Sequence, residues 1–181
     1  MKKLFLNFID DSKVKNFVDI ALQKVDPKFW TAPSSFSGKY HPQENNGEGG
    51  LARHTHKVLV IAAHLCKIFR INDWRRDCIL AAAILHDTYK CGDVWGGYTD
   101  VRHAWIAFQR YKFMEADISY QKRDLICQCI RFHMAEWSDP LNERELAKRP
   151  TTEERIIQIA DYLSSRKDLS FYSGIKSGEE K

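Results

Sequence analysis

A run of eight apolar residues, 78–85 (CILAAAIL), is followed directly by His86 and Asp87. A helix through this run has no polar face, so we expect it to lie at the centre of a helical bundle. A histidine and a carboxylate at the end of a buried helix are costly unless they are paired or bound to a metal ion. A buried aspartate is rare without a partner. The sequence therefore leaves two interpretations of Asp87: a metal ligand, or a helix cap or ion-pair partner of Lys90.

Apolar residues recur at helical spacing through most of the chain, and no segment alternates as a strand does. We expect an all-α fold, a single-domain helical bundle with about six main helices, because 181 residues suit one domain. Its core is expected at residues 49–165, preceded by a helix and a long loop in residues 1–48 and followed by a frayed tail at 173–181. The expected helices span residues 12–25, 51–70, 74–90, 101–115, 121–136 and 152–167.

The long loop at residues 26–50 is rich in proline and glycine but also carries large aromatic residues. A loop of this length inside a compact domain is uncommon and often functional, and its aromatic residues predict that it packs onto the body of the protein. Trp30 or Tyr40 would stack on a base if the substrate were a nucleotide, but core packing is the commoner role of large aromatics. Short hydroxyls and basic side chains suit a phosphate-binding loop, whereas a turn-rich packing loop is the alternative. The residues considered for substrate binding here are Ser34, Ser35, Lys39 and His41.

Composition narrows the classes of protein further. The formal net charge is +4 and no run of five basic residues occurs, so a face for duplex nucleic acid has weak support. No window approaches the roughly 18 apolar residues of a membrane helix, and the short apolar N-terminus stops at Asp10 and Asp11 without a cleavage site. The chain has five cysteines, an odd number, which argues against a set of disulfides. No C-x-x-C pair occurs, which argues against a zinc site built from cysteines. We expect a soluble, cytoplasmic protein with no membrane partner and with buried cysteines.

Two neighbouring histidines differ in their expected environment. On a helical wheel, Val58, Ile61 and Leu65 lie within about 40° of His54, so His54 is expected on the buried face. His56 lies about 200° from His54 and is expected to face solvent. A lone histidine on an apolar face is more often a core residue with satisfied hydrogen bonds than a ligand, so His54 alone does not establish a metal site.

The later helices offer further potential ligands. His133 shares a face with Ile126, Cys129 and Ile130, whereas periodicity does not decide the burial of His103. Asp161 points largely away from the apolar face formed by Ile156, Ile159, Ala160 and Leu163, so the pattern favours a solvated charge there.

Three segments, taken in this order, resemble the HD-domain superfamily of metal-dependent phosphohydrolases, whose name refers to its adjacent His-Asp pair. They are residues 49–55 (GGLARHT), 85–90 (LHDTYK) and 159–163 (IADYL), and the resemblance covers about residues 49–165. Residues 33–42, which lead into the glycine pair before the first histidine, are similar to the N-terminal region of an uncharacterised bacterial and phage subgroup.

The resemblance implies that His54, His86, Asp87 and Asp161 bind one metal ion. In members with two ions, additional histidines lie between the His-Asp pair and the last aspartate, and His103 and His133 occupy such places. The resemblance thus implies a binuclear site bridged by Asp87, although Met134 stands where a further histidine often follows.

We therefore expect a metal-dependent phosphohydrolase that cleaves the phosphate ester of a nucleotide or related small molecule with metal-activated water. The ligand types suit one or two ions of Mn²⁺, Fe²⁺, Zn²⁺ or Ni²⁺ better than Mg²⁺. Asp87 and Lys90 are expected to be catalytic, with Lys90 as a phosphate contact or, alternatively, a solvated lysine at a helix end. The remaining alternatives are a nuclease or cyclic-nucleotide phosphodiesterase, a non-catalytic metal- or nucleotide-binding module, and a helical bundle with unrelated histidines.

Overall fold

The computed structural model describes residues 1–36, 42–134, 150–167 and 169, and these residues form helices and no strand. The all-α prediction is therefore confirmed for the described part of the chain. The α-helices are α1 (Lys2–Leu6), α2 (Ser12–Lys24), α3 (Gly50–Ile68), α4 (Trp74–Leu85), α5 (His103–Lys112), α6 (Tyr120–Phe132) and α8 (Thr152–Ser164), and the 3₁₀ helices are η1 (Pro27–Trp30) and η2 (Gln43–Asn45). No helix among the described residues is both long and apolar enough to span a bilayer.

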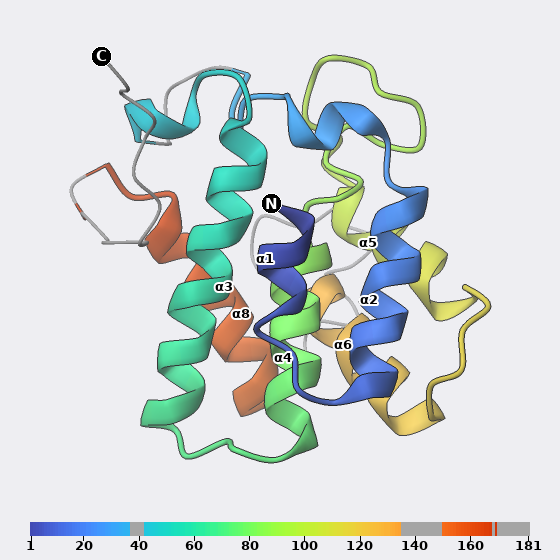
Figure 1. Ribbon diagram of the computed structural model, residues 1–181. Coiled ribbons are helices and arrows are strands. Elements are labelled where there is room, and N and C mark those ends of the chain that lie inside the picture. The colour runs from blue at the N-terminus through green and yellow to red at the C-terminus, as the bar shows by residue number, and fades with distance from the viewer. Residues whose placement is uncertain (37–41, 135–149, 168, 170–181) are drawn as a thin grey trace.

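Helix α4 occupies the centre of the bundle (Figure 1), with α2, α3, α6 and α8 packed around it. Every residue of α4 from Asp77 to Leu85 is buried, as the absence of a polar face predicts. The helix ends at Leu85, five residues earlier than expected, and the chain continues in turns. This early end places His86 and Asp87 at the end of the central helix, against the helices that surround it.

The short helix α1 was not predicted, and it explains why the prediction for His56 is wrong. Phe5 of α1 and Phe8, just after it, pack on the His56 ring, with centroids 6.4 and 6.0 Å away. His56 is consequently buried, and burial lowers its pKa. The periodicity of α3 predicted one apolar and one solvated face, but Phe5 and Phe8 cover this helix at His56. A helix enclosed on several sides does not reveal its orientation through periodicity.

The loop between α2 and α3 packs onto the body of the protein, as its aromatic residues indicated. The Trp30 ring lies 4.9 Å from that of Phe29 and 6.0 Å from that of Phe5. Trp30 therefore packs against other aromatic residues, which was the commoner of the two roles considered for it. Ser34 is fully buried, and its hydroxyl donates to the carbonyl oxygen of Asn45 at 2.8 Å. Because this bond occupies the hydroxyl and the residue is fully buried, Ser34 is not accessible to a substrate. Ser35 is partly exposed, whereas Lys39, Tyr40 and His41 lie outside the described residues.

A close approach of this loop to α3 fixes the start of the helix that carries His54. A Cβ atom on Gly50 would lie 1.9 Å from the carbonyl oxygen of Asn45, which is far inside van der Waals contact. We expect Gly50→Ala to lower the free energy of unfolding by about 3 kcal/mol, because the backbone of the loop must move. Urea unfolding checks this value. Gly47→Ala is the matched control, since a Cβ there meets only the Arg53 guanidinium at 4.0 Å; an equal loss in both variants would contradict the explanation.

The cysteine prediction is also confirmed. All five cysteines are buried and none forms a disulfide. Burial raises the pKa of Cys66, Cys78 and Cys127 to about 12, so these thiols are protonated and act as small apolar groups.

Candidate metal centre

Four histidines and two aspartates meet at one end of the central helix. His54 lies on α3, His103 begins α5 and Asp161 lies on α8. The other three follow helix ends: His86 and Asp87 come after α4, and His133 comes after α6. Both aspartates and all four histidines expected as ligands are therefore brought together, and five of the six are buried. Asp161 is the exception, with a side chain that is 20% exposed.

One group of ligand atoms surrounds the Oδ2 atom of Asp87. The Nε2 atoms of His54 and His86 lie 3.6 and 3.5 Å from this oxygen. The same two nitrogens lie 3.0 and 3.8 Å from Oδ1 of Asp161. Ligand atoms that each stand about 2.1 Å from one ion are separated by about 3–4 Å, so His54, His86 and Asp87 suit a single divalent cation, and Asp161 lies beside the two imidazoles.

A second group surrounds the other oxygen of Asp87. Its Oδ1 atom lies 3.1 Å from Nε2 of His103 and 3.8 Å from Nε2 of His133. The two imidazole nitrogens lie 3.1 Å from each other. Asp87 thus presents one carboxylate oxygen to each group, as a residue shared between two neighbouring cation sites would.

Three of the histidines make the same hydrogen bond with the ring nitrogen that faces away from the cluster. Nδ1 of His86, His103 and His133 each donates to the backbone carbonyl oxygen three residues earlier, at 2.8, 2.7 and 2.6 Å. A carbonyl only accepts, so the proton of a neutral ring resides on Nδ1 and the Nε2 lone pair faces the cluster. Nε2 of His86 is buried and has no hydrogen-bond partner. Burying such a nitrogen costs free energy unless its lone pair binds a cation. The donor set therefore fits divalent metal ions.

The fourth histidine is oriented by Ser164, a residue that the sequence analysis missed. Nδ1 of His54 lies 2.9 Å from the buried Ser164 hydroxyl, which lies 3.0 Å from the carbonyl oxygen of Asp161. The arrangement allows Nδ1–H of His54 to donate to Ser164 while Ser164 donates to the carbonyl. Ser164 follows Asp161 by three residues, so a hydroxyl one turn after the last ligand was the available signal.

We expect Ser164→Ala to weaken metal affinity by about 10- to 100-fold, because His54 loses the partner that fixes its ring. Equilibrium competition with a chelating dye measures this change. Ser165→Ala is the matched control, since the Ser165 hydroxyl also donates to the Asp161 carbonyl, at 2.8 Å, but is not bonded to His54. Unchanged affinity in Ser164→Ala would show that this contact does not orient a ligand.

The pKa values of two histidines and of both aspartates are shifted in the direction that favours metal binding. Burial lowers the pKa of His86 and lowers that of His133 to about 3, so both rings are neutral. Burial alone would raise the pKa of Asp87, but Lys90 and the imidazoles outweigh it and hold that pKa well below its usual value. At Asp161 burial would likewise raise the pKa, but the contact with His54 and the three nearby imidazoles together lower it. Neutral imidazoles and ionised carboxylates bind cations without first losing protons.

Lys90 is buried beside this cluster, so it is not a solvated lysine at a helix end. Its Nζ lies 2.6 Å from Oδ2 of Asp87. The ion pair considered as the alternative role of Asp87 therefore exists, within the same group of residues that suits a cation. Lys90 supplies the one lysine or arginine charge that pairs with Asp87 among the described residues.

Asp161 faces the cluster because the buried side of α8 differs from the expected one. Ile156, Ile157, Ala160 and Ser164 are buried, whereas Ile159 is 36% exposed. Asp161 lies about 85° from the middle of this observed face, compared with about 150° from the middle of the predicted one. It sits at the border between core and solvent, and a pocket of about 310 Å³ opens there between His133 and Asp161.

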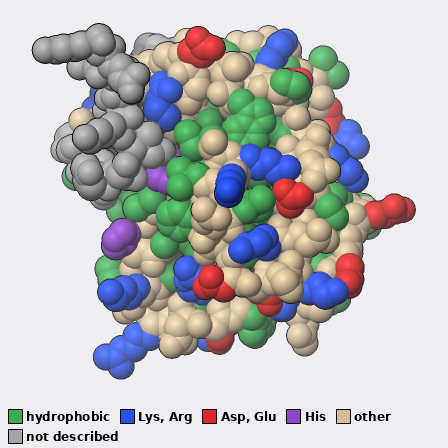
Figure 2. Space-filling model, in the orientation of Figure 1, with side chains coloured by type: hydrophobic (Ala, Val, Ile, Leu, Met, Phe, Trp, Pro, Cys, Tyr) green, Lys and Arg blue, Asp and Glu red, His purple; other side chains and the backbone are tan. Residues whose placement is uncertain are grey.

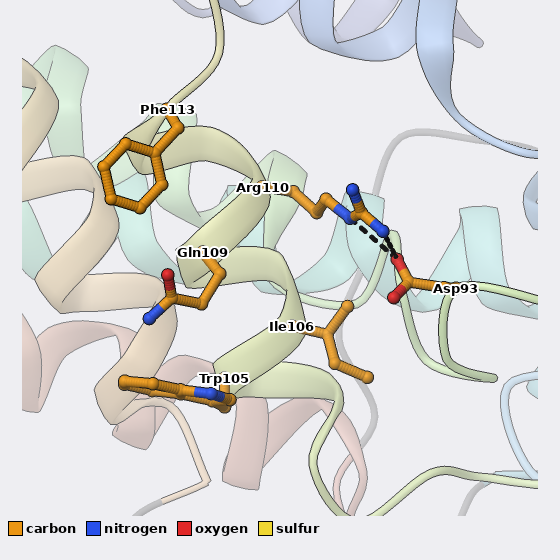
Figure 3. A pocket seen from close by; sticks show the side chains of 6 residues that line it. All are labelled: Asp93, Trp105, Ile106, Gln109, Arg110 and Phe113. Atoms are coloured by element: carbon orange, nitrogen blue, oxygen red, sulfur yellow. Dashed lines mark hydrogen bonds and ion pairs between the residues drawn. The ribbon is translucent and has the colours of Figure 1, made fainter.

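A second pocket, of about 500 Å³, lies on the outer face of α5 (Figure 3) and contains no such cluster. Its one carboxylate, Asp93, forms an ion pair with Arg110 at 2.7 Å. Lysine and arginine side chains are scattered among acidic ones on the face seen in Figure 2 and form no continuous basic band there. The metal-binding chemistry of the described residues is therefore concentrated at the end of α4.

Comparison with protein families gives one match. The family model described as HD domain matches residues 51–166, which is more than half of the chain and includes all six clustered residues. Comparisons with curated proteins and with solved structures give no match.

Proposed function

Because this chain belongs to the HD-domain family, we propose that it hydrolyses the phosphate ester of a small molecule, such as a nucleotide, at the cluster around Asp87. The observation that carries the proposal is the shared carboxylate. Its two oxygens face two separate sets of buried imidazole nitrogens, one completed by Asp161.

The residues that would hold metal ions follow from these two sets. His54, His86, Asp87 and Asp161 would bind one ion, and Asp87, His103 and His133 would bind a second. Imidazole and carboxylate ligands favour Mn²⁺, Fe²⁺, Zn²⁺ or Ni²⁺ over Mg²⁺. Bound there, such ions supply Lewis-acid chemistry, which lowers the pKa of a water molecule and offsets charge on phosphoryl oxygens.

The protein's own groups supply positioning and charge. Asp87 stays ionised and orients the attacking water by accepting a hydrogen bond. Lys90, held at Asp87, would donate to a phosphoryl oxygen of the bound ester and so favour the more negative transition state. The surrounding side chains are buried, so these interactions act in a medium of low polarity.

Two alternatives differ in what they require. A nuclease needs a basic track along a strand, which the scattered charges in Figure 2 do not form on that face. A non-catalytic metal-binding module needs ligands that close the coordination sphere, whereas Asp161 is partly exposed and borders an open pocket.

Elemental analysis and a substrate screen test the proposal together. We expect purified protein to retain divalent metal, and the metal-loaded protein to hydrolyse small phosphate monoesters or diesters faster than it degrades oligonucleotides. The screen should compare Mn²⁺, Fe²⁺, Zn²⁺, Ni²⁺ and Mg²⁺. Tightly bound metal without turnover of any ester would favour the binding module and reject the hydrolase.

A further inference from the structure

The pocket beside the metal centre continues along the exposed side of α8, away from the ligands. Its inner end is formed by His133 and Asp161. Its outer wall consists of Arg155, Gln158, Ile159 and Tyr162, which share one stripe of the helix. A volume of about 310 Å³ is at the small end of the range of ligand sites, roughly 300–1,000 Å³, and suits one compact molecule.

Arg155 differs from the exposed arginines Arg75 and Arg110 in its partner. Arg75 and Arg110 form ion pairs with Glu153 and Asp93 respectively. Arg155 instead donates from Nη1 to the Gln158 side-chain oxygen at 3.1 Å, and none of the described acidic residues pairs with it. Gln158 lies one turn nearer to Asp161, so this bond directs the guanidinium towards the metal end of the pocket.

The part of the wall nearer to Asp161 is apolar and aromatic. Ile159 and Tyr162 are 36% and 57% exposed, although residues of this size on a helix usually face the core. The Arg166 guanidinium lies over the Tyr162 ring, 5.4 Å from its centroid. An aromatic ring beside a guanidinium is a surface on which a planar ligand group packs well.

We propose that this wall of α8 binds the organic part of the substrate, and that Arg155 recognises a second anionic group on it. This inference rests on the proposed function, because it assumes that the scissile phosphate lies at Asp161 and His133. Arg155 precedes Asp161 by six residues, a rise of about 9 Å along the helix. The second anion is therefore separated from the scissile phosphate by a spacer such as a sugar, as in a nucleoside 3′,5′-bisphosphate. In this arrangement Arg155 determines substrate specificity, and Ile159 and Tyr162 contact the base of the nucleoside.

A matched pair of probes tests the role of Arg155: adenosine 5′-monophosphate and adenosine 3′,5′-bisphosphate. For the metal-loaded protein we expect Arg155→Ala to raise the KM and Kd for the bisphosphate by about 10- to 100-fold, since it removes hydrogen bonds to a charged group. Both constants for the monophosphate should change less than about threefold, with metal content and kcat close to wild type. Arg155→Lys should restore part of the loss, because it keeps the charge without the planar fork of donors. Arg110→Ala, which removes an exposed arginine on α5, is the control.

The binding arm separates this inference from the proposed function. Calorimetric binding of the bisphosphate that depends on Arg155 supports the recognition role even if neither probe is hydrolysed, in which case the hydrolase proposal fails alone. Hydrolysis with equal constants for both probes in wild type and Arg155→Ala overturns the inference and leaves the hydrolase intact. An equal loss in Arg155→Ala and Arg110→Ala would also overturn it, because the effect would then be one of general charge.

Discussion

Asp87→Asn is expected to lose both bound metal and at least about 10³-fold of turnover while keeping its fold. The substitution preserves the size of the side chain but removes the charge that two groups of imidazoles share, through contacts of 3.1 to 3.8 Å. An amide is a weak metal ligand, so neither cation site keeps its common carboxylate. It also leaves the Lys90 ammonium buried without its 2.6 Å partner. A loss of about 4 kcal/mol of transition-state stabilisation corresponds to the expected 10³-fold loss of turnover.

Metal content by elemental analysis and initial rates on the best ester of the screen measure the two losses. Circular dichroism establishes that the helices remain. His64→Ala is the control, because His64 lies on the same helix as His54 but is exposed at the surface. His56→Ala does not serve this purpose, since His56 is packed under Phe5 and Phe8. An Asp87→Asn protein with normal metal content, or with a tenth of the wild-type rate, would contradict the shared-ligand assignment.

The central feature of the fold was predictable because it is encoded within a single segment. A helix without a polar face can only be buried, and α4 is buried along its whole apolar run. The burial of His86 and Asp87 after α4 was predictable for the same reason, and a carboxylate at a buried position requires a partner, which the sequence left as either a metal ion or Lys90. His54 and His133 followed from sharing a face with apolar residues on their own helices.

The errors arose where a contact between distant segments decides the outcome. His56 is buried by Phe5 and Phe8 from the start of the chain, and nothing in α3 itself indicates this cover. Asp161 lies at the border between the buried and exposed faces of α8. The buried face includes Ile157 and Ser164, which lie on the side of Asp161, so Asp161 faces the cluster and not the solvent. For Ser164 the spacing from Asp161 was a weak signal, and only the contact of its hydroxyl with the His54 ring gives the residue a role. Periodicity describes one helix at a time, whereas a site built from five segments depends on how they pack.

Metal binding is expected to raise the melting temperature by about 8–16 °C. A ligand that binds only the folded state stabilises it by RT ln(1 + [L]/Kd), which is about 4 kcal/mol at a thousandfold excess over Kd. A chain of this size gains about 2–4 °C for each kcal/mol. The effect should be large here because the cluster brings two ionised carboxylates together with one lysine, so the folded protein lacks positive charge where cations would bind.

Differential scanning calorimetry with and without a chelator measures the shift, at a fixed pH and over a series of Mn²⁺ concentrations. The midpoint should rise with the logarithm of the free metal concentration once the sites are saturated, and chelator should reverse the rise completely. Asp87→Asn separates this site from surface binding, because its midpoint should respond weakly to the same metal concentrations. The same rise in Asp87→Asn and wild type would place the stabilising ions elsewhere. A midpoint insensitive to metal in the wild type, with chelator removing no metal, would mean that these buried residues satisfy one another without a cation.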